Sequence, residues 1–459
     1  MKFEDLSFSD APIIKGEIPG PKSKKLLQKQ DELEGNAVSY PRGSPIGFAQ
    51  GKGATIMDMD GNIFIDFFGG AGVLATGHCN PFVQEKVEEA QKNITHTLDF
   101  PTKYRIDLIE KLQKVLPGDL RDNAKIQFGG PTGSDAVESA IKLSKTITGR
   151  KGIIAFEGAY HGMTSGALSL CSGKSWKENY IPLLPEVHFT PFAYSYRCPF
   201  GSKNDKDCAS ASAAFYEHIL EDPHSGVCTP AMTIVEPIQG EGGSIVPHDS
   251  FIKKITDISR NYEVPIVFDE IQAGFCRTGK FFSAEHSKAT PDIMTISKAV
   301  GGGYPLSAIA YRSDLDVWKK AAHIGTFRGN IIAMVAGVAS IDFMLENKLA
   351  EYSEKLGKHF INRLKPLEQK SAVVGEVRGR GLMIGIEIVS DKETQKPSSE
   401  ICTKIRNEMF KKGVIIEIGG HYNNVLRFLP PLIISQKLAD NGIDITISAI
   451  EEVEGALDL

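Results

Sequence analysis

The sequence predicts an α/β protein with a mostly parallel sheet, because short apolar runs alternate with longer stretches of helical periodicity. The runs 264–268 and 293–297 contain β-branched residues and little polar alternation, which is typical of strands buried on both faces. Asp269 and Glu270 follow the first run, and Lys298 follows the second. Ligands of parallel sheets bind at the carboxyl ends of the strands, so we expect these acids and the lysine to meet in one cleft.

A lysine and an acid at one sheet edge have a chemical meaning that neither has alone. A lysine after a strand can be a solvated loop cation, and an Asp–Glu pair can cap the next helix. A lysine amine can also form a Schiff base with an aldehyde, and in pyridoxal-phosphate enzymes an acid keeps the pyridine nitrogen protonated. Together, Lys298 and Asp269 therefore favour covalent catalysis over a surface role.

The composition allows a large core and argues against several classes of protein. The chain has 459 residues, of which 41% are hydrophobic and 24% are charged, with a formal net charge of −5. This predicts at least two domains and no nucleic-acid partner. The longest apolar stretch, 331–341, is too short to span a bilayer, and residues 1–20 lack the pattern of a signal peptide. We therefore expect a cytoplasmic protein with no membrane partner.

The cysteines do not form a metal or disulfide pattern. There are seven of them, scattered and odd in number, without a Cys-x-x-Cys pair. This distribution argues against a disulfide framework and against a zinc site, so we expect reduced thiols and no metal.

A glycine-rich turn between a strand and a helix is a candidate phosphate site. The strand 126–128 enters this turn, and the apolar positions of the following helix share one face: Val137, Ala140, Ile141 and Ile147. A helix amino end offers unpaired N–H groups and a positive dipole end, so Gly133 and Ser134 could hold a phosphate. The alternative is that they serve only as turn and N-cap.

Two further strands are expected to bring polar residues to the same edge. The strand 153–156 leads to Tyr160, whose ring could stack on a flat heterocycle or be a buried structural aromatic. The strand 232–235 is followed by Glu236 and Glu241. Residues 172–230 are rich in polar residues and prolines and are predicted to be loop, apart from a helix near 209–220.

The two ends of the chain are expected to form a smaller α/β domain. The domains are predicted at 1–75 (an arm and part of the small domain), 76–340 (the large domain) and 341–459. The amino-terminal elements expected are a helix at 23–34, a hairpin with strands 54–57 and 63–65, and helices at 81–93 and 103–116. The carboxyl-terminal elements expected are an amphipathic helix at 331–345, helices at 350–367, 399–412 and 436–454, and strands at 373–378, 382–388, 414–417 and 425–428.

In this order, these motifs resemble the class III, or ω-amino acid, aminotransferases from about Gly47 onward. The motifs are Asp-Met-Asp-Gly-Asn at 58–62, Thr-Gly-Ser at 132–134, Tyr-His-Gly at 160–162, Val-Glu-Pro-Ile-Gln-Gly-Glu at 235–241, Phe-Asp-Glu-Ile-Gln-Ala-Gly at 268–274, Ser-Lys at 297–298, Thr-Phe-Arg-Gly-Asn at 326–330 and Leu-Arg-Phe at 426–428. The resemblance implies a fold-type I transferase that binds pyridoxal 5'-phosphate in a large domain with a seven-stranded, mostly parallel sheet.

The resemblance also implies roles for individual residues. Lys298 would bond the cofactor aldehyde and move the substrate proton, and Asp269 would pair with the pyridine nitrogen. The other cofactor ligands implied are Gly133, Ser134 and Thr326 for the phosphate, Tyr160 and Ile271 for the two ring faces, Gln272 for the ring oxygen, and His161 and Glu236 nearby. In this family the threonine comes from the partner subunit, so a homodimer with a shared active site is expected.

Substrate recognition is implied for two more residues, and one departure narrows the choice of substrate. Arg427 would bind the α-carboxylate of 2-oxoglutarate or glutamate, and Glu241 would mask that arginine when an ω-amino donor is bound. Relatives that act on ornithine or 4-aminobutyrate carry a motif similar to His-Gly-Arg. This chain has Met163 at the position of the arginine, which makes those donors less favoured. A second departure is Cys276, where relatives often carry glycine. We interpret it as a change in packing.

Within the family, the chain is most similar to diaminobutyrate–2-oxoglutarate transaminases. The segments that carry this similarity are 40–42, 129–138, 160–164, 196–201 and 325–330. The implied reaction moves the 4-amino group of L-2,4-diaminobutyrate to 2-oxoglutarate and gives aspartate 4-semialdehyde and glutamate, reversibly. The alternatives are another ω-aminotransferase acting on ornithine, 4-aminobutyrate or lysine, an amino-acid racemase or epimerase of the same fold, and a non-enzymatic regulator that binds the cofactor.

Overall fold

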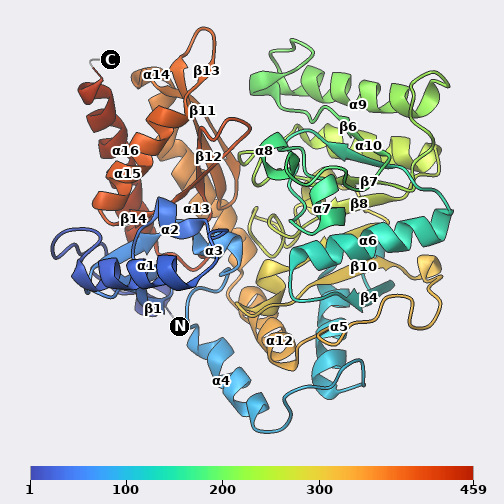
Figure 1. Cartoon of the computed structure of the whole chain (residues 1–459), viewed down its shortest axis with the longest axis horizontal. Coiled ribbons are helices and arrows are strands. Elements are labelled where there is room, and N and C mark those ends of the chain that lie inside the picture. The colour runs from blue at the N-terminus through green and yellow to red at the C-terminus, as the bar shows by residue number, and fades with distance from the viewer. Residues whose placement is uncertain (1, 458–459) are drawn as a thin grey trace. The chain divides into compact units, whose positions relative to one another are not determined.

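The computed structural model describes residues 2–457, which divide into two compact units (Figure 1). The large unit comprises residues 82–351. The terminal unit combines the chain up to Pro81 with the chain from Tyr352 onward. Each unit has its own sheets.

The large unit is built on a seven-stranded sheet with the strand order β4-β10-β9-β8-β7-β5-β6. Its strands are β4 (Ala124–Phe128), β5 (Ile153–Phe156), β6 (Val187–Thr190), β7 (Met232–Val235), β8 (Ile266–Asp269), β9 (Ile293–Ile296) and β10 (Ala308–Arg312). Among the described strands of this sheet, only β10 runs antiparallel to its neighbours. The predicted α/β fold with a mostly parallel sheet is confirmed.

Helices pack against this sheet and close its core. The helices of the large unit are α4 (Pro81–Gln91), α5 (Lys103–Val115), α6 (Gly133–Thr148), α7 (Ser165–Ser169), α8 (Lys174–Lys177), α9 (Asp205–Glu221), α10 (Asp249–Asn261), α11 (Ala284–Ser287) and α12 (Ile331–Glu346). On α6, Val137, Ala140 and Ile141 pack in one cluster with the strand residues Ile234 and Val267. The predicted apolar face of this helix therefore lies on the sheet.

The prediction of loop over residues 172–230 is wrong in part. This stretch contains β6, the outermost strand next to β5, and α9, which starts at Asp205 rather than near 209. Only one residue of β6 is fully buried, and such a half-exposed edge strand lacks the continuous apolar run on which the prediction depended. Among the elements that were not predicted are α10 and the antiparallel strand β10, which both lie outside this stretch.

The expected amphipathic helix at 331–345 is present as α12, but it is not amphipathic. Ten of its sixteen residues are buried, and they lie on nearly all of its sides. A helix that is apolar around its whole circumference is a core helix. Within residues 2–457, no helix is long and apolar enough to cross a membrane.

The terminal unit contains two sheets, with strand orders β1-β2-β3-β14 and β11-β12-β16-β15. The strands are β1 (Phe48–Lys52), β2 (Thr55–Asp58), β3 (Ile63–Asp66), β11 (Val374–Arg380), β12 (Met383–Asp391), β13 (Lys396–Pro397), β14 (Val414–Ile415), β15 (Glu417–Gly419) and β16 (Val425–Phe428). The longer helices are α1 (Pro21–Leu33), α13 (Leu349–Leu364), α15 (Ser399–Lys411) and α16 (Gln436–Ala456). The predicted hairpin is the antiparallel pair β2–β3.

The single strand predicted at 414–417 is wrong. The chain forms β14, which pairs in parallel with β3, and then β15, which pairs with β16 in the other sheet. Ile416 lies between the two strands and is 2% exposed. Because the apolar run continues through Ile416, the sequence carries no sign of the break.

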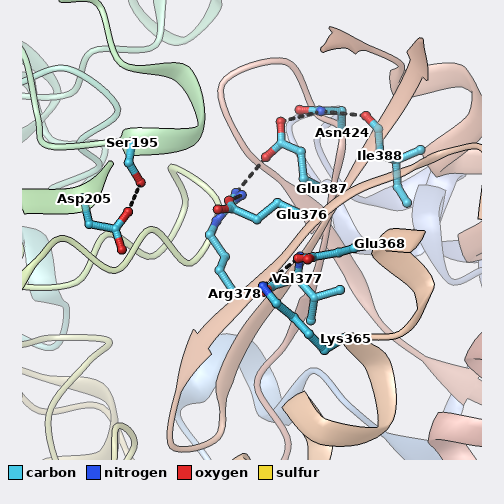
Figure 2. Close-up of polar contacts among 10 residues, drawn as sticks. All are labelled: Ser195, Asp205, Lys365, Glu368, Glu376, Val377, Arg378, Glu387, Ile388 and Asn424. Carbon is cyan, nitrogen blue, oxygen red and sulfur yellow. Dashed lines mark hydrogen bonds and ion pairs between the residues drawn. The ribbon is translucent and has the colours of Figure 1, made fainter. Parts of the chain in front are cut away.

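A buried polar network joins three strands of the second sheet (Figure 2). Arg378 on β11 bonds Glu376 at 2.6 Å and Glu387 on β12 at 2.8 Å. The other oxygen of Glu387 accepts a hydrogen bond of 2.9 Å from Asn424, which also donates to the carbonyl of Ile388. Removing one member would leave a buried charge without its partner, so this network fixes β11, β12 and the start of β16 together.

Candidate active site

A cavity of about 190 Å³ lies in the large unit and gathers most of the predicted site residues. Its lining residues are Thr132, Gly133, Ser134, Tyr160, His161, Gly162, Glu236, Glu241, Asp269, Ile271, Gln272 and Lys298. Every predicted site residue is among them except Thr326 and Arg427. A larger hollow of about 850 Å³ in the terminal unit contains none of the predicted site residues.

The parallel strands explain why residues so far apart in the sequence meet in this cavity. Asp269 is the last residue of β8, and Glu236 directly follows β7. Lys298 comes two residues after the end of β9. Tyr160 follows β5 in the same direction. All these strands present their carboxyl ends at one edge, which is where ligands bind in such sheets.

Asp269 is buried and held in a fixed orientation. It is 4% exposed, and its Oδ2 lies 2.6 Å from Nδ1 of His161. Its Oδ1 accepts a hydrogen bond of 3.1 Å from the backbone N–H of Ile271. With the proton on Nδ1, His161 donates to the carboxylate. A buried acid oriented by two donors can present a negative charge to a ligand without reorganising.

Glu236 is a second buried acid beside this pair. Its two oxygens accept hydrogen bonds from the backbone N–H groups of Tyr160 (3.1 Å) and Gly240 (2.8 Å). Burial raises the pKa of Glu236 to about 7, and the charge of Asp269 raises it further, while His161 and the two N–H groups oppose the shift. Near neutral pH, Glu236 therefore exchanges a proton readily, as acids in functional sites often do.

The backbone at Lys298 is in a conformation that side chains rarely adopt. Its φ is 51°, in the left-handed region, and it opens a 3₁₀ turn that runs to Gly301. The preceding Ser297 anchors this turn through a hydrogen bond of 2.8 Å from its hydroxyl to the carbonyl of Leu306. Such a conformation costs about 1–3 kcal/mol and is found mainly at functional sites. This backbone conformation fixes where the Lys298 side chain starts at the cavity.

The amino end of α6 is built to receive an anion. Thr132, rather than Gly133 or Ser134, is the N-cap, and its N–H and hydroxyl both bond Asp135, at 2.9 and 2.8 Å. Gly133 and Ser134 therefore occupy the first helical turn, where N–H groups lack partners within the helix. A Cβ on Gly133 would lie 2.9 Å from Cδ1 of Ile271, so a larger residue would have to displace the end of that side chain. The positive end of a helix sixteen residues long thus lies at the cavity.

A lysine, a buried acid and an anion site in one cavity agree with the family that the sequence matches. The family described as aminotransferase class-III covers residues 39–450. The chain belongs to the class III aminotransferases.

Individual relatives of this aminotransferase are similar along nearly their whole length. It is 40% identical over 439 residues to the diaminobutyrate–2-oxoglutarate aminotransferase of Rhizobium meliloti, covering 94% of this chain and 91% of the relative. It is 40% identical over 422 residues to the enzyme of the same name from Haemophilus influenzae, covering 90% and 92%. Among solved structures, an amine transaminase from an uncultivated Pseudomonas species in a PLP-bound form has a TM-score of 0.83 and 25% identity, covering 92% of this chain and 98% of that one.

Gln272 and Glu241 meet at the rim of the aminotransferase cavity. The Nε2 of Gln272 donates to Oε1 of Glu241 at 3.3 Å. A Cβ on Gly240 would lie 1.9 Å from Oε1 of Gln272, so glycine lets this amide pass close to the backbone. The loop after β7 thereby orients both Gln272 and Glu241.

Thr326 and Met163 belong to the large unit but do not line the cavity. Thr326 is exposed. Met163 is 50% exposed, and its backbone N–H donates to the hydroxyl of Ser134 at 3.1 Å.

Arg427 belongs to the terminal unit, where it is 1% exposed on β16. Gly385 on β12 and Glu417 on β15 are its partners in register on the two neighbouring strands. Residues that are directly opposite on neighbouring strands point to the same face. On its own face of the sheet, the arginine therefore lies between Gly385, which has no side chain, and the acid Glu417.

Three residues that contribute to the site were missed as site residues in the sequence. Thr132 and Gly162 line the cavity. Both belong to motifs from which other site residues were predicted, Thr-Gly-Ser at 132–134 and Tyr-His-Gly at 160–162, so the sequence did carry a signal for them. Cys171 does not line the cavity, but its sulfur accepts a hydrogen bond from the backbone of His161. No sequence motif points to it, because the contact depends on how the loop after Tyr160 folds back.

Proposed function

We propose that this aminotransferase moves the 4-amino group of L-2,4-diaminobutyrate to 2-oxoglutarate, giving aspartate 4-semialdehyde and glutamate. One observation carries the proposal of amino-group chemistry: Lys298, Asp269 and the amino end of α6 line one cavity. The choice of donor rests on the names of the relatives that are 40% identical over most of the chain.

The cavity residues fit pyridoxal 5'-phosphate, and we assign this cofactor to them. The first turn of α6, with Gly133 and Ser134, suits the phosphate. Asp269, held by His161, suits the pyridine nitrogen, and Lys298 suits the aldehyde. The remaining roles proposed are Tyr160 and Ile271 at the ring faces and Gln272 at the ring oxygen. When bound, this cofactor supplies an aldehyde for amines and an electron sink for the reacting carbon.

The chain's own groups would do three things during the reaction. The Nζ of Lys298 accepts and returns the proton of the reacting carbon. The carboxylate of Asp269 would pair with the ring nitrogen, and His161 keeps that carboxylate oriented. Glu236 fixes the backbone N–H of Tyr160, so the aromatic ring keeps its position at the cavity wall.

Arg427 and Glu241 are the proposed substrate-recognition residues. A buried arginine offers a planar fork that matches a carboxylate, which suits the acceptor 2-oxoglutarate. Met163 cannot bind a carboxylate, so ornithine and 4-aminobutyrate are the less favoured donors. The exchange expected between Glu241 and Arg427 stays a prediction.

We also propose that the enzyme acts as a homodimer in the cytoplasm, with Thr326 completing the phosphate site of a partner. Two observations support the dimer. Thr326 is exposed and does not line the cavity of its own chain. Its neighbours Ile324 and Phe327 are 67% and 65% exposed, so two large apolar side chains close together in the sequence are available for a partner to cover.

The test is a donor panel with purified protein. Diaminobutyrate, ornithine, lysine and 4-aminobutyrate are each supplied with 2-oxoglutarate and the cofactor, and glutamate formation is measured. Diaminobutyrate is expected to give the highest kcat/KM. If it is inert while another donor reacts, the proposed donor is wrong. If α-protons exchange with deuterated solvent and no glutamate forms, the protein is a racemase or epimerase instead.

A further inference from the structure

The backbone of segment 160–163 is held by side chains from three other parts of the large unit. The N–H of Tyr160 donates to Glu236 at 3.1 Å, and the N–H of Met163 donates to the hydroxyl of Ser134 at 3.1 Å. Both acceptors line the cavity and belong to the proposed cofactor set. The middle of the segment is held by a residue outside that set.

That residue is Cys171, which bonds the segment twice. Its sulfur accepts a hydrogen bond of 3.1 Å from the N–H of His161, and its thiol donates to the carbonyl of Gly162 at 3.3 Å. The carbonyl of Ala167 is a second acceptor at 3.5 Å. The side chain is 0% exposed, and burial raises the pKa of the Cys171 thiol to about 11. The thiol therefore keeps its proton at neutral pH and can donate and accept at once.

The next residue, Ser172, adds hydrogen bonds to the same loop. The N–H of Ser172 donates to the carbonyl of Ala159 at 3.0 Å, and its hydroxyl accepts from the N–H of Gly158 at 2.7 Å. Residues 171 and 172 thus run beside the loop that leads from β5 into the cavity, and bond it at four points. Cys171 provides the two that lie nearest the cavity-lining side chains.

These contacts matter because of what the held backbone carries. Nδ1 of His161 lies 2.6 Å from Asp269, so a shift of this backbone would lengthen a short buried bond. The ring of Tyr160, one residue earlier, lies edge-on to Trp176 with centroids 5.2 Å apart and has little room to compensate. Cys171 itself touches neither Asp269 nor the cavity, so any effect it has on the ligand is indirect.

We propose that Cys171 is a positioning residue of the cofactor site, whose thiol sets the position of His161 and Tyr160 through their backbone. This inference rests on the proposed assignment of pyridoxal 5'-phosphate to the cavity. The alternative is that Cys171 only fills space, as buried cysteines commonly do. The two hypotheses differ in whether cofactor affinity depends on the hydrogen bonds of the Cys171 thiol or only on its volume.

The experiment compares Cys171→Ala and Cys171→Ser with the native enzyme. The dissociation constant of pyridoxal 5'-phosphate from the full-length protein is measured by fluorescence titration, alongside the Tm of the cofactor-free protein. Cys171→Ala is expected to weaken cofactor binding about tenfold, since it removes the hydrogen bonds that hold His161. Cys171→Ser keeps a group that donates and accepts, so its dissociation constant is expected to stay within about threefold of native.

Cys402→Ala is the matched control. Cys402 is also 0% exposed, but it lies on α15 in the terminal unit. Its loss should lower Tm by a similar amount and leave the dissociation constant within about twofold, because only buried volume is removed.

Three results would overturn the inference: native affinity in Cys171→Ala, equal weakening in Cys171→Ala and Cys171→Ser, or equal weakening in Cys402→Ala. If Cys171→Ala does not fold, Cys171→Ser decides alone, because a loss of more than about tenfold would contradict the role of hydrogen bonding. If the native enzyme does not bind pyridoxal 5'-phosphate, the proposed function fails first. If it binds and the cysteine variants match it, only the role of Cys171 fails.

Discussion

The imidazole of His161 and the carboxylate of Asp269 share a hydrogen bond of 2.6 Å, and both side chains are almost fully buried. They come from the loop after β5 and the end of β8, which are 108 residues apart in the sequence. Both residues line the cavity, so the carboxylate of Asp269 is available to a ligand there. A change to either partner therefore acts on the proposed cofactor nitrogen.

Asp269→Asn is expected to lower kcat by at least about 10²-fold, because the amide keeps the size of the side chain but removes its charge. His161→Gln should cost less, about tenfold, since the carboxylate remains and loses only one orienting donor. Steady-state kinetics with saturating cofactor check both values. Equal losses in the two variants would contradict the view that the charge resides on Asp269.

Lys298→Ala is expected to lower kcat by at least about 10³-fold, because the group that moves the proton is lost. Borohydride reduction followed by peptide mass spectrometry should place the cofactor on Lys298 of the native protein. Lys280, elsewhere in the same unit and exposed, provides the control, and Lys280→Ala should keep native kcat. Finding the reduced cofactor on another lysine would contradict the assignment.

Glu236 is expected to make stability depend on pH. The pKa of this carboxyl is about 4.5 in the unfolded chain, and burial raises the pKa of Glu236 to about 7 in the folded protein. Between these values the folded state binds more protons, so stability falls as pH rises, by about 3 kcal/mol at most. Glu236→Gln does not titrate. Its deficit relative to native should therefore be largest at pH 5 and shrink by pH 8, measured by urea unfolding of the cofactor-free protein.

Parallel stability curves for the native protein and Glu236→Gln would contradict this prediction. Glu270 also has a pKa raised to about 7 by burial. It is present in both proteins, so its contribution cancels in the comparison.

Gly162→Ala is expected to be much more damaging than Gly149→Ala. Both glycines have positive φ, 125° and 69°. A Cβ at Gly162 would lie 2.0 Å from the hydroxyl of Ser134, whereas the space around Gly149 is open. Gly149→Ala should cost about 1 kcal/mol of unfolding free energy from backbone strain alone. Gly162→Ala should cost at least about 2 kcal/mol and also weaken cofactor binding, since Ser134 must move. Similar losses in urea unfolding would contradict the clash.

Arg427→Lys is expected to raise the KM for 2-oxoglutarate by about 10- to 100-fold, because an ammonium cannot form the two parallel bonds of a guanidinium. The rate at which the donor is converted in the absence of 2-oxoglutarate, measured by rapid mixing, should change less than about threefold. Arg363→Lys tests another arginine of the same unit, which bonds Asp440 on α16, and should leave KM unchanged. An unchanged KM in Arg427→Lys would remove this residue from the carboxylate site.

The sequence was informative where a residue's position follows from one strand or one helix end. Asp269 and Lys298 could be placed at a common edge because parallel strands end together, and Gly133 and Ser134 because a helix must start after the glycine turn. Contacts that depend on the return of a loop could not be predicted in this way. Cys171 is an example, since nothing in its neighbourhood along the chain indicates that it lies under His161.

Strand boundaries were hardest to predict in fully buried runs, because such runs lack the alternation of apolar and polar residues. The apolar run Val414–Ile416 continues past the end of β14, so the break before β15 at Glu417 leaves no pattern in the residues. β10 was overlooked because its alanines at 308 and 310 have weak strand preference, although the sheet around it buries them completely. In both cases tertiary contacts, rather than local preference, set the structure.

The pairing of β3 with β14 has a consequence for how the protein is made. Val414, the partner of Ile65, is synthesised about 350 residues after it. The large unit lies entirely between them and can mature first. Until residues 414 and 415 have been synthesised, the edge of β3 at Ile65 and Asp66 lacks its partner strand, and an unpaired strand edge of this kind can pair with another chain.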